Sequence, residues 1–148
     1  MQKIRPFLWY DNQAEEAVSH YTSIFRNSRI GKSMPGPGGR AHTIEFMLEG
    51  TEFVALNGGP HFKFTEAISL AVDCGSQEEV DELWEKLSAG GSTGQCGWLK
   101  DRYGLSWQIV PTLLIELLAT PKSKQRVIET MMQMSKFDIA KLQKAAAE

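Results

Sequence analysis

The chain has 148 residues, of which 42% are hydrophobic and 23% are charged. This length and composition are typical of one globular domain and exclude a disordered or fibrous chain. Sixteen basic and eighteen acidic residues give a net charge of −2, so no overall positive field favours nucleic acid or an anionic membrane. No apolar run suits a signal peptide or reaches the roughly 18 residues of a membrane span. We therefore expect a cytoplasmic protein with two free thiols, Cys74 and Cys96.

The first residues predict a strand followed by a helix. Residues 4–10 are rich in aromatic and branched side chains and end at Asp11-Asn12, as strands often do. Asn12 and Glu15 have the spacing of a capping box, which predicts the start of a helix. Behind them, apolar residues recur at helical spacing from Ala14 to Phe25. One face of this helix is therefore suited to pack on a sheet.

A loop and a hairpin complete the first half. Residues 34–40 are rich in glycine and proline, which predicts a loop. Residues 43–48 and 52–56 are strand-like, and Glu49-Gly50-Thr51 lies between them. A short connection containing glycine between two such runs indicates a β-hairpin.

The second half repeats this order of elements. Residues 67–72 form a strand pattern, and Ser76 with Glu79 has the spacing of a second capping box. An apolar helical stripe follows from Val80 to Leu87 and ends before Gly90-Gly91. Two further strands are predicted, at 95–101 and 105–110.

The chain therefore consists of two similar modules and an extension. Both halves follow the order strand, helix, strand, strand, strand, although few identical residues support the match. We expect an α+β fold of two βαβββ modules, at about 1–60 and 61–111. Residues 112–148 form a helical extension of the same domain, with helices at 112–119, from Thr120-Pro121 and after Phe137.

Each module leaves one face of its sheet uncovered, because a single helix covers only one side. Two modules can turn these faces toward each other and enclose a cavity for a small, flat or partly apolar ligand. In the second module, alternation places Ala67, Ser69 and Ala71 on the cavity side, and Ile68, Leu70 and Val72 beneath the helix. The candidate binding residues combine aromatic rings with amide and hydroxyl groups: Trp9, Phe46, Asn57, Ser69, Trp98 and Gln108.

Several segments together resemble the vicinal-oxygen-chelate superfamily, which includes glyoxalase I and bleomycin-resistance proteins, and within it the PhnB-like branch. The resemblance extends along nearly the whole chain, and its tail resembles that branch's C-terminal extension. It implies two βαβββ modules and a homodimer whose partners build the cavities jointly. The segments that carry it are Phe7–Tyr21, Leu56–Pro60, Phe64–Leu70, Cys96–Asp101, Tyr103–Pro111 and Arg126–Ala140.

The resemblance also implies where a divalent metal would bind. Enzymes of this superfamily hold it with His, Gln or Glu from the first and last strands of each module, so that the cation polarises the substrate's oxygens. The first-strand positions fall near Pro6 and Ala67, and the last-strand positions fall at Val54 and Gln108. Of these residues, only Gln108 has a side chain able to bind a metal, and it would do so at best as a neutral oxygen donor. A second arrangement, from His42, His61 and Glu66, has no distinctive spacing. We expect no resident metal or other cofactor.

Three functions are compatible with the sequence. The first is binding of a small molecule without a full metal site, with no catalytic residue assigned. The second is a metal-dependent enzyme of the glyoxalase, dioxygenase or thiol-transfer type, and the third is an interaction role for the C-terminal helices as a dimerising arm. The branch is often labelled 3-demethylubiquinone-9 3-methyltransferase, but no glycine-rich turn joins a strand to a helix here to hold S-adenosylmethionine.

Overall fold

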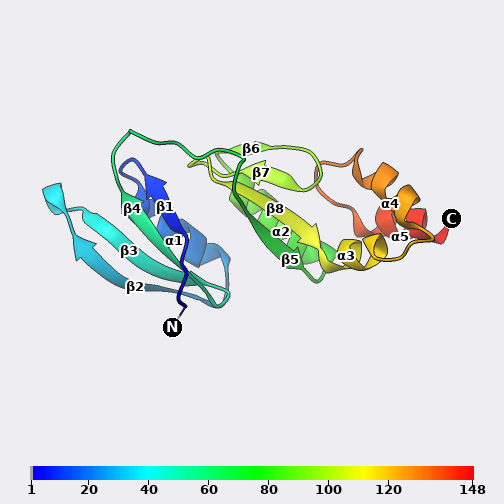
Figure 1. Ribbon diagram of the computed structural model, residues 1–148, viewed down its shortest axis with the longest axis horizontal. Helices are drawn as coiled ribbons and strands as arrows, with labels where there is room; N and C mark the ends of the chain where they lie inside the picture. The colour runs from blue at the N-terminus through cyan, green and yellow to red at the C-terminus, as the bar shows by residue number, and fades with distance from the viewer. Residues whose placement is uncertain (1) are drawn as a thin grey trace. The chain divides into compact units, whose positions relative to one another are not determined.

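The computed structural model describes residues 2–148. They form two compact units that divide between Phe64 and Thr65. Each unit contains a four-stranded sheet with a helix against one face, and the second unit also contains three C-terminal helices (Figure 1). The predicted α+β fold of two βαβββ modules with a helical extension is confirmed. No helix among residues 2–148 is both long and apolar enough to cross a bilayer.

The first sheet has the strand order β1-β4-β3-β2. Strand β1 runs parallel to β4, whereas β3 pairs antiparallel with both β4 and β2. Between β3 and β4, Glu49 and Gly50 both have positive φ, of 49° and 83°, as a type I′ hairpin requires. The predicted hairpin is therefore present. The elements of this unit are β1 (Phe7–Tyr10), α1 (Ala14–Ile24), β2 (Ser28–Pro35), the short 3₁₀ helix η1 (Pro37–Gly39), β3 (Ala41–Leu48) and β4 (Thr51–Asn57).

The first helix is capped by a distant residue and not by its own capping box. The predicted cap Asn12 lies before Gln13, the residue at the N-cap position, and Gln13 makes no side-chain capping bond. Instead, Asn57 at the end of β4 accepts a hydrogen bond from the Ala14 backbone N–H through Oδ1 at 2.9 Å. Its Nδ2 donates to Glu15 Oε1 at 2.7 Å and to the Ala41 carbonyl at 2.9 Å. One amide thus ties α1 to β3 and β4.

The second sheet has the strand order β5-β8-β7-β6. Helix α2 (Gln77–Ser88) begins as predicted, because Ser76 Oγ accepts from the Glu79 backbone N–H at 3.2 Å. The strand predicted at 95–101 is shorter, since Cys96 and Gly97 have positive φ, of 55° and 82°. Their N–H groups donate to the Met134 and Ser135 carbonyls, both at 2.8 Å. The strands are β5 (Ser69–Cys74), β6 (Ser92–Thr93), β7 (Trp98–Lys100) and β8 (Ser106–Pro111).

A buried carboxylate organises the turn between β7 and β8. Asp101 is only 2% exposed. Its Oδ1 accepts from the backbone N–H groups of Tyr103 and Leu105 at 2.9 and 3.1 Å, and its Oδ2 accepts from Trp107 Nε1 at 2.9 Å. Charge-assisted hydrogen bonds of this kind compensate for removing a carboxylate from water. They hold the turn in place and fix the indole of Trp107 within the core.

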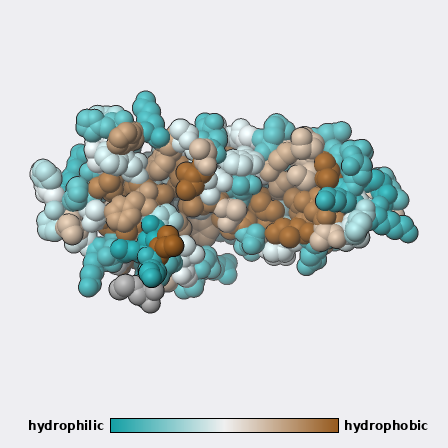
Figure 2. Space-filling view, viewed as in Figure 1, coloured by the Kyte–Doolittle hydropathy of each residue, from teal (hydrophilic) through white to brown (hydrophobic). Residues whose placement is uncertain are grey.

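The C-terminal extension folds on its own small core within the second unit. Helices α3 (Thr112–Leu118), α4 (Lys124–Met131) and α5 (Ile139–Ala147) surround the buried cluster of Leu114, Val127, Phe137 and Leu142. Residues 121–123 form a turn, so the second of these helices begins later than Pro121. Gln77 attaches the extension to α2, because its Nε2 donates to the Phe137 carbonyl at 2.9 Å and its Oε1 accepts from the Ile139 N–H at 2.8 Å. In Figure 2, hydrophobic side chains gather over α3 and the end of β8.

The cap contributed by Asn57 leads to a stability prediction. We expect Asn57→Ala to lower the free energy of unfolding by about 1–2 kcal/mol, because it leaves the Ala14 N–H and the Ala41 carbonyl without this partner. The matched control is Asn12→Ala, which removes the cap that the sequence suggested, and it should change stability by less than about 0.5 kcal/mol. Urea unfolding followed by circular dichroism measures both. A larger loss for Asn12→Ala than for Asn57→Ala would contradict the assignment.

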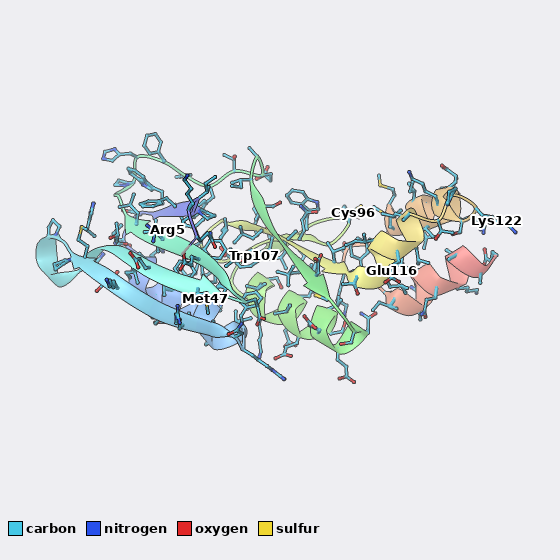
Figure 3. All side chains as sticks on the ribbon, turned by 60° about the horizontal axis from the view of Figure 1, so that its bottom comes forward. Arg5, Met47, Cys96, Trp107, Glu116 and Lys122 are labelled. Atoms are coloured by element: carbon cyan, nitrogen blue, oxygen red, sulfur yellow. The ribbon has the colours of Figure 1, made fainter. Side chains whose placement is uncertain are left out.

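The two thiols should differ in reactivity. Cys74 is fully buried, and burial, together with the nearby carboxylates of Glu79 and Asp73, raises its pKa to about 12. At pH 8 it therefore forms almost no thiolate, the species that alkylating reagents attack. Cys96 is partly exposed beside the C-terminal helices (Figure 3). We expect iodoacetamide at pH 8 to modify Cys96 alone, as seen by mass spectrometry, and to modify nothing in folded Cys96→Ser. Rapid labelling of Cys74 in the folded protein would contradict this.

Candidate functional site

Three of the predicted binding residues share one face of the second sheet. Across β5, β8 and β7, Ala71 is opposite Gln108, and Gln108 is opposite Trp98. In the neighbouring row, Ser69 is opposite Ser106, and Ser106 is opposite Lys100. Directly opposed residues, and residues two apart on one strand, have side chains on the same face. The sheet therefore brings together Ser69, Trp98 and Gln108.

The other face of this sheet belongs to the core. Trp107 and Ile109 alternate with Ser106 and Gln108 along β8 and are both buried, at 2% and 0% exposure. Helix α2 contributes the buried residues Val80, Leu83 and Leu87 to that side. We call the opposite face, which carries Ser69, Trp98, Lys100, Ser106 and Gln108, the polar face of the second sheet. It differs from the core face in exposing amide, hydroxyl and ammonium groups.

The polar face contains a hydrogen bond and an ion pair. Gln108 Nε2 donates to Ser69 Oγ at 2.8 Å, which fixes the orientation of both side chains. Lys100 Nζ lies 2.5 Å from Glu66 Oε1, and both side chains remain about half exposed. The hydrogen bond from Lys100 and its positive charge together lower the pKa of Glu66 below its usual value. Lys100 is thus held beside Ser106 by a partner at the surface.

Lys100 and Ser106 were not among the residues suggested by the sequence. The signal that could have found them is the alternation along β7 and β8. Because Trp98 and Gln108 share one face of the sheet, the residues two positions away, Lys100 and Ser106, must lie on that face too. Only the register between the strands shows that they are directly opposed.

Trp9 lies in the first unit, on the side of the sheet away from α1, and its side chain packs against other residues of that unit. Its Nε1 donates to the Gly59 carbonyl at 2.9 Å, and its ring meets Phe62 edge to face with centroids 4.9 Å apart. A Cβ at Gly58 would come within 2.3 Å of the indole, so the chain passes closely over this ring. Elsewhere in the first unit, Arg5 and Met47 (Figure 3) line a hollow of about 60 Å³ that Trp9 does not border.

Phe46 and Asn57 lie on the opposite side from the one that the sequence suggested. Phe46 is 3% exposed and stacks on Phe53 and on Tyr21 of α1, with ring centroids 5.3 and 6.3 Å apart. Alternation along β3 turns it toward the helix together with Ile44 and Leu48. The amide of Asn57 is engaged by the start of α1, as described above. Both residues therefore belong to the framework of the first unit.

In the second unit, Ile68 does not lie beneath the helix, where the sequence placed it, because it precedes β5 and is 55% exposed.

One hollow of the first unit was not predicted. It has a volume of about 480 Å³ and lies between α1 and the β2–β3 hairpin, next to Val18, Ile30, Arg40 and Ile44. Glu15 borders it, but its carboxylate already accepts hydrogen bonds from the Ala41 N–H and from Asn57, which contribute to lowering its pKa. This hollow offers mainly apolar walls.

The side chains present do not fit a divalent metal. Within residues 2–148, no three His, Cys, Asp or Glu side chains gather closely enough to hold one. Of the positions that the family resemblance implies, Val54 is buried and apolar, and Pro6 uses its carbonyl to accept the Val54 N–H at 3.0 Å. Gln108 then remains as a single neutral donor, fewer than the three or more protein ligands of a typical catalytic site.

Comparison with solved structures supports this fold. A PhnB protein of Bacillus cereus, described under the 3-demethylubiquinone-9 3-methyltransferase name, is 34% identical, with a TM-score of 0.70 over 74% of this chain and 99% of its own. Protein PA1353 of Pseudomonas aeruginosa is 17% identical, with a TM-score of 0.64 over 75% of this chain and 98% of its own. The fosfomycin resistance protein FosX of Listeria monocytogenes, in complex with Mn(II) and sulfate, is 18% identical, with a TM-score of 0.54 over 75% of this chain and 91% of its own.

The family assignment rests on the sequence as well. No curated protein matches the chain. The family model for 3-demethylubiquinone-9 3-methyltransferase matches residues 2–110, which include both sheets except for Pro111 at the end of β8. Helices α3, α4 and α5 lie beyond the match. The chain belongs to this family, in the PhnB-like branch of the vicinal-oxygen-chelate superfamily.

Proposed function

We propose that the protein binds a small aromatic molecule on the polar face of the second sheet, without a resident metal. The observation that carries this proposal is the placement of Ser69, Trp98 and Gln108 on one face of β5, β8 and β7. An aromatic surface beside a few fixed polar groups is the usual composition of a small-molecule site. Membership of the PhnB-like branch supports the proposal, because FosX, a protein of similar fold, is named for resistance to a small molecule.

Each of the three residues has a distinct part in binding. The half-buried ring of Trp98 offers a face on which a flat ligand can stack. Gln108 is held by its bond to Ser69, which leaves Oε1 without a hydrogen bond from residues 2–148. That oxygen can accept from a ligand hydroxyl or amide N–H. A neutral hydrogen bond of this kind contributes about 1 kcal/mol and stacking on an aromatic ring contributes about as much, so we expect this face alone to bind a small probe weakly.

A metal-dependent enzyme of the glyoxalase or dioxygenase type is the second candidate. Its support is the similarity of fold to FosX, which was solved in complex with Mn(II). We place it second because Gln108 is the one donor at the implied positions. We do not extend the methyltransferase activity of the family description to this chain. The turns after the parallel strands β1 and β5, Asp11-Asn12-Gln13 and Gly75-Ser76, contain a single glycine between them, whereas the nucleotide-binding turn requires several.

Two further features stay predictions. The family resemblance implies a homodimer, and the C-terminal helices are candidates for its dimerising arm. Their exposed residues Ile115 and Met132 suit such a contact, at 52% and 61% exposure. A cytoplasmic location likewise stays a prediction.

The proposed site is tested by titrating the protein with neutral aromatic probes, indole and benzamide, and following backbone amide shifts by NMR. We expect the largest shifts in β5, β7 and β8 and a dissociation constant in the millimolar range. Gln108→Leu should weaken the binding of benzamide by about fivefold, the equivalent of roughly 1 kcal/mol. Trp98→Leu should weaken the binding of both probes. The matched control is Trp84→Phe on α2. The proposal would be contradicted if the shifts were spread over other elements. It would also be contradicted if no shift appeared at probe concentrations up to 10 mM, since a dissociation constant of that size corresponds to roughly 3 kcal/mol of binding free energy.

Metal content is a separate test. We expect protein purified without a chelator to contain far less than one equivalent of divalent metal by elemental analysis, because one amide oxygen cannot replace the charged and imidazole ligands of such sites. Treatment with EDTA should leave the melting temperature unchanged. A stoichiometric metal that Gln108→Leu removes would favour the enzyme and contradict the metal-free proposal.

A further inference from the structure

Ser106 is a buried hydroxyl whose hydrogen-bonding capacity is unused. It is 0% exposed, and its Oγ has no hydrogen-bond partner among residues 2–148. Buried hydroxyls nearly always have such a partner, because losing water without compensation is unfavourable. An exception on the face that carries the proposed binding residues calls for a functional explanation.

The neighbours of Ser106 show what kind of group would suit it. Ser69 and Lys100 are its direct partners on the two flanking strands, so all three side chains share one row of the polar face. Lys100 Nζ reaches Glu66 Oε1 at 2.5 Å. Glu66 precedes β5 and Lys100 ends β7, and β8 with Ser106 lies between these strands. An ion pair thus joins the two sides of the strand that carries the unpaired hydroxyl.

This ion pair can be exchanged at little cost. Both of its side chains are about half exposed, at 45% for Lys100 and 62% for Glu66, and exposed pairs contribute little to stability. A carboxylate supplied by a ligand can replace that of Glu66 on Lys100, so the ammonium keeps an anionic partner. The second oxygen of the incoming carboxylate can accept from Ser106, which Glu66 leaves unpaired. The exchange therefore adds one hydrogen bond without losing a charge pair.

We propose that Lys100 and Ser106 form a subsite for a ligand carboxylate. In the absence of a ligand, Glu66 forms the ion pair with Lys100, and the ligand carboxylate displaces it. This inference rests on the proposed function, since Trp98 is to hold the ligand's ring. Trp98 and Lys100 are two residues apart on β7, which places their side chains about 6.6 Å apart on one face. A ring with a carboxylate attached directly or through one methylene matches that spacing. The row offers one cation, so the ligand class is an aromatic monocarboxylate.

The experiment compares benzoate with its neutral analogue benzamide by NMR titration of the full-length protein. We expect benzoate to bind about tenfold more tightly, because a charge-assisted hydrogen bond is stronger than a neutral one. Lys100→Met should abolish this preference. Glu66→Gln should strengthen benzoate binding severalfold, since it removes the competing carboxylate, and should not strengthen benzamide binding. Lys86→Met is the matched control, because it breaks the Lys86–Glu82 pair at the surface of α2.

Ser106→Ala separates a binding role from a structural one. It removes a hydroxyl that has no partner, so the melting temperature should stay the same or rise, while benzoate binding weakens about fivefold. Weaker binding of benzoate to Glu66→Gln, or no effect of Ser106→Ala on benzoate, would overturn the subsite. Tighter binding of phenylphosphonate than of benzoate would overturn the assignment to a carboxylate.

The result also distinguishes this inference from the proposed function. If benzamide and benzoate bind equally on the polar face and neither depends on Lys100, the carboxylate subsite fails and the aromatic site stands. If neither probe perturbs β5, β7 or β8, the proposed function itself fails, and the subsite fails with it.

Discussion

In each unit, one helix packs against a four-stranded sheet and covers only one of its faces. Because side chains alternate along a strand, this single constraint divides every strand into a core set and an outward set. In β8 the core set includes Trp107 and Ile109, and the outward set includes Ser106 and Gln108. The polar groups that we assign to ligand binding are therefore a direct consequence of how the core is packed.

Side-chain hydrogen bonds connect the elements that carry these faces. Asn57 joins the start of α1 to the ends of β3 and β4, and Asp101 joins the β7–β8 turn to the indole of Trp107. Asp101 lies next to Lys100 and determines how β7 ends. Asn57 and Asp101 thus help to fix the backbone of the strands that carry the outward side chains. Neither residue lies on the polar face.

The polar face differs from a metal centre in what it provides. A metal site polarises a substrate through several charged or imidazole ligands held by rigid strands. Here the corresponding strands present an amide, two hydroxyls and one ammonium group, of which the amide and one hydroxyl bond to each other. Such groups recognise a molecule by hydrogen bonding and charge. These groups are the basis of the small-molecule binding that we propose for this face.

The sequence by itself determined the order of the main helices and strands, because hydrophobic periodicity and turn residues are local signals. It did not locate β2 and β6, whose residues are mostly polar and exposed. The Glu49-Gly50 hairpin and the Ser76 cap were both predictable from a few adjacent residues. The cap of α1 was not, since Asn57 lies 43 positions from Ala14 and only the folded sheet brings them together. Phe46 was placed on the wrong face for a related reason: an aromatic residue in a strand suits either side, and only the position of α1 decides which one is buried. The opposition of Lys100, Ser106 and Ser69 was likewise decided by the tertiary structure, because pairing between strands depends on contacts among residues far apart in the chain.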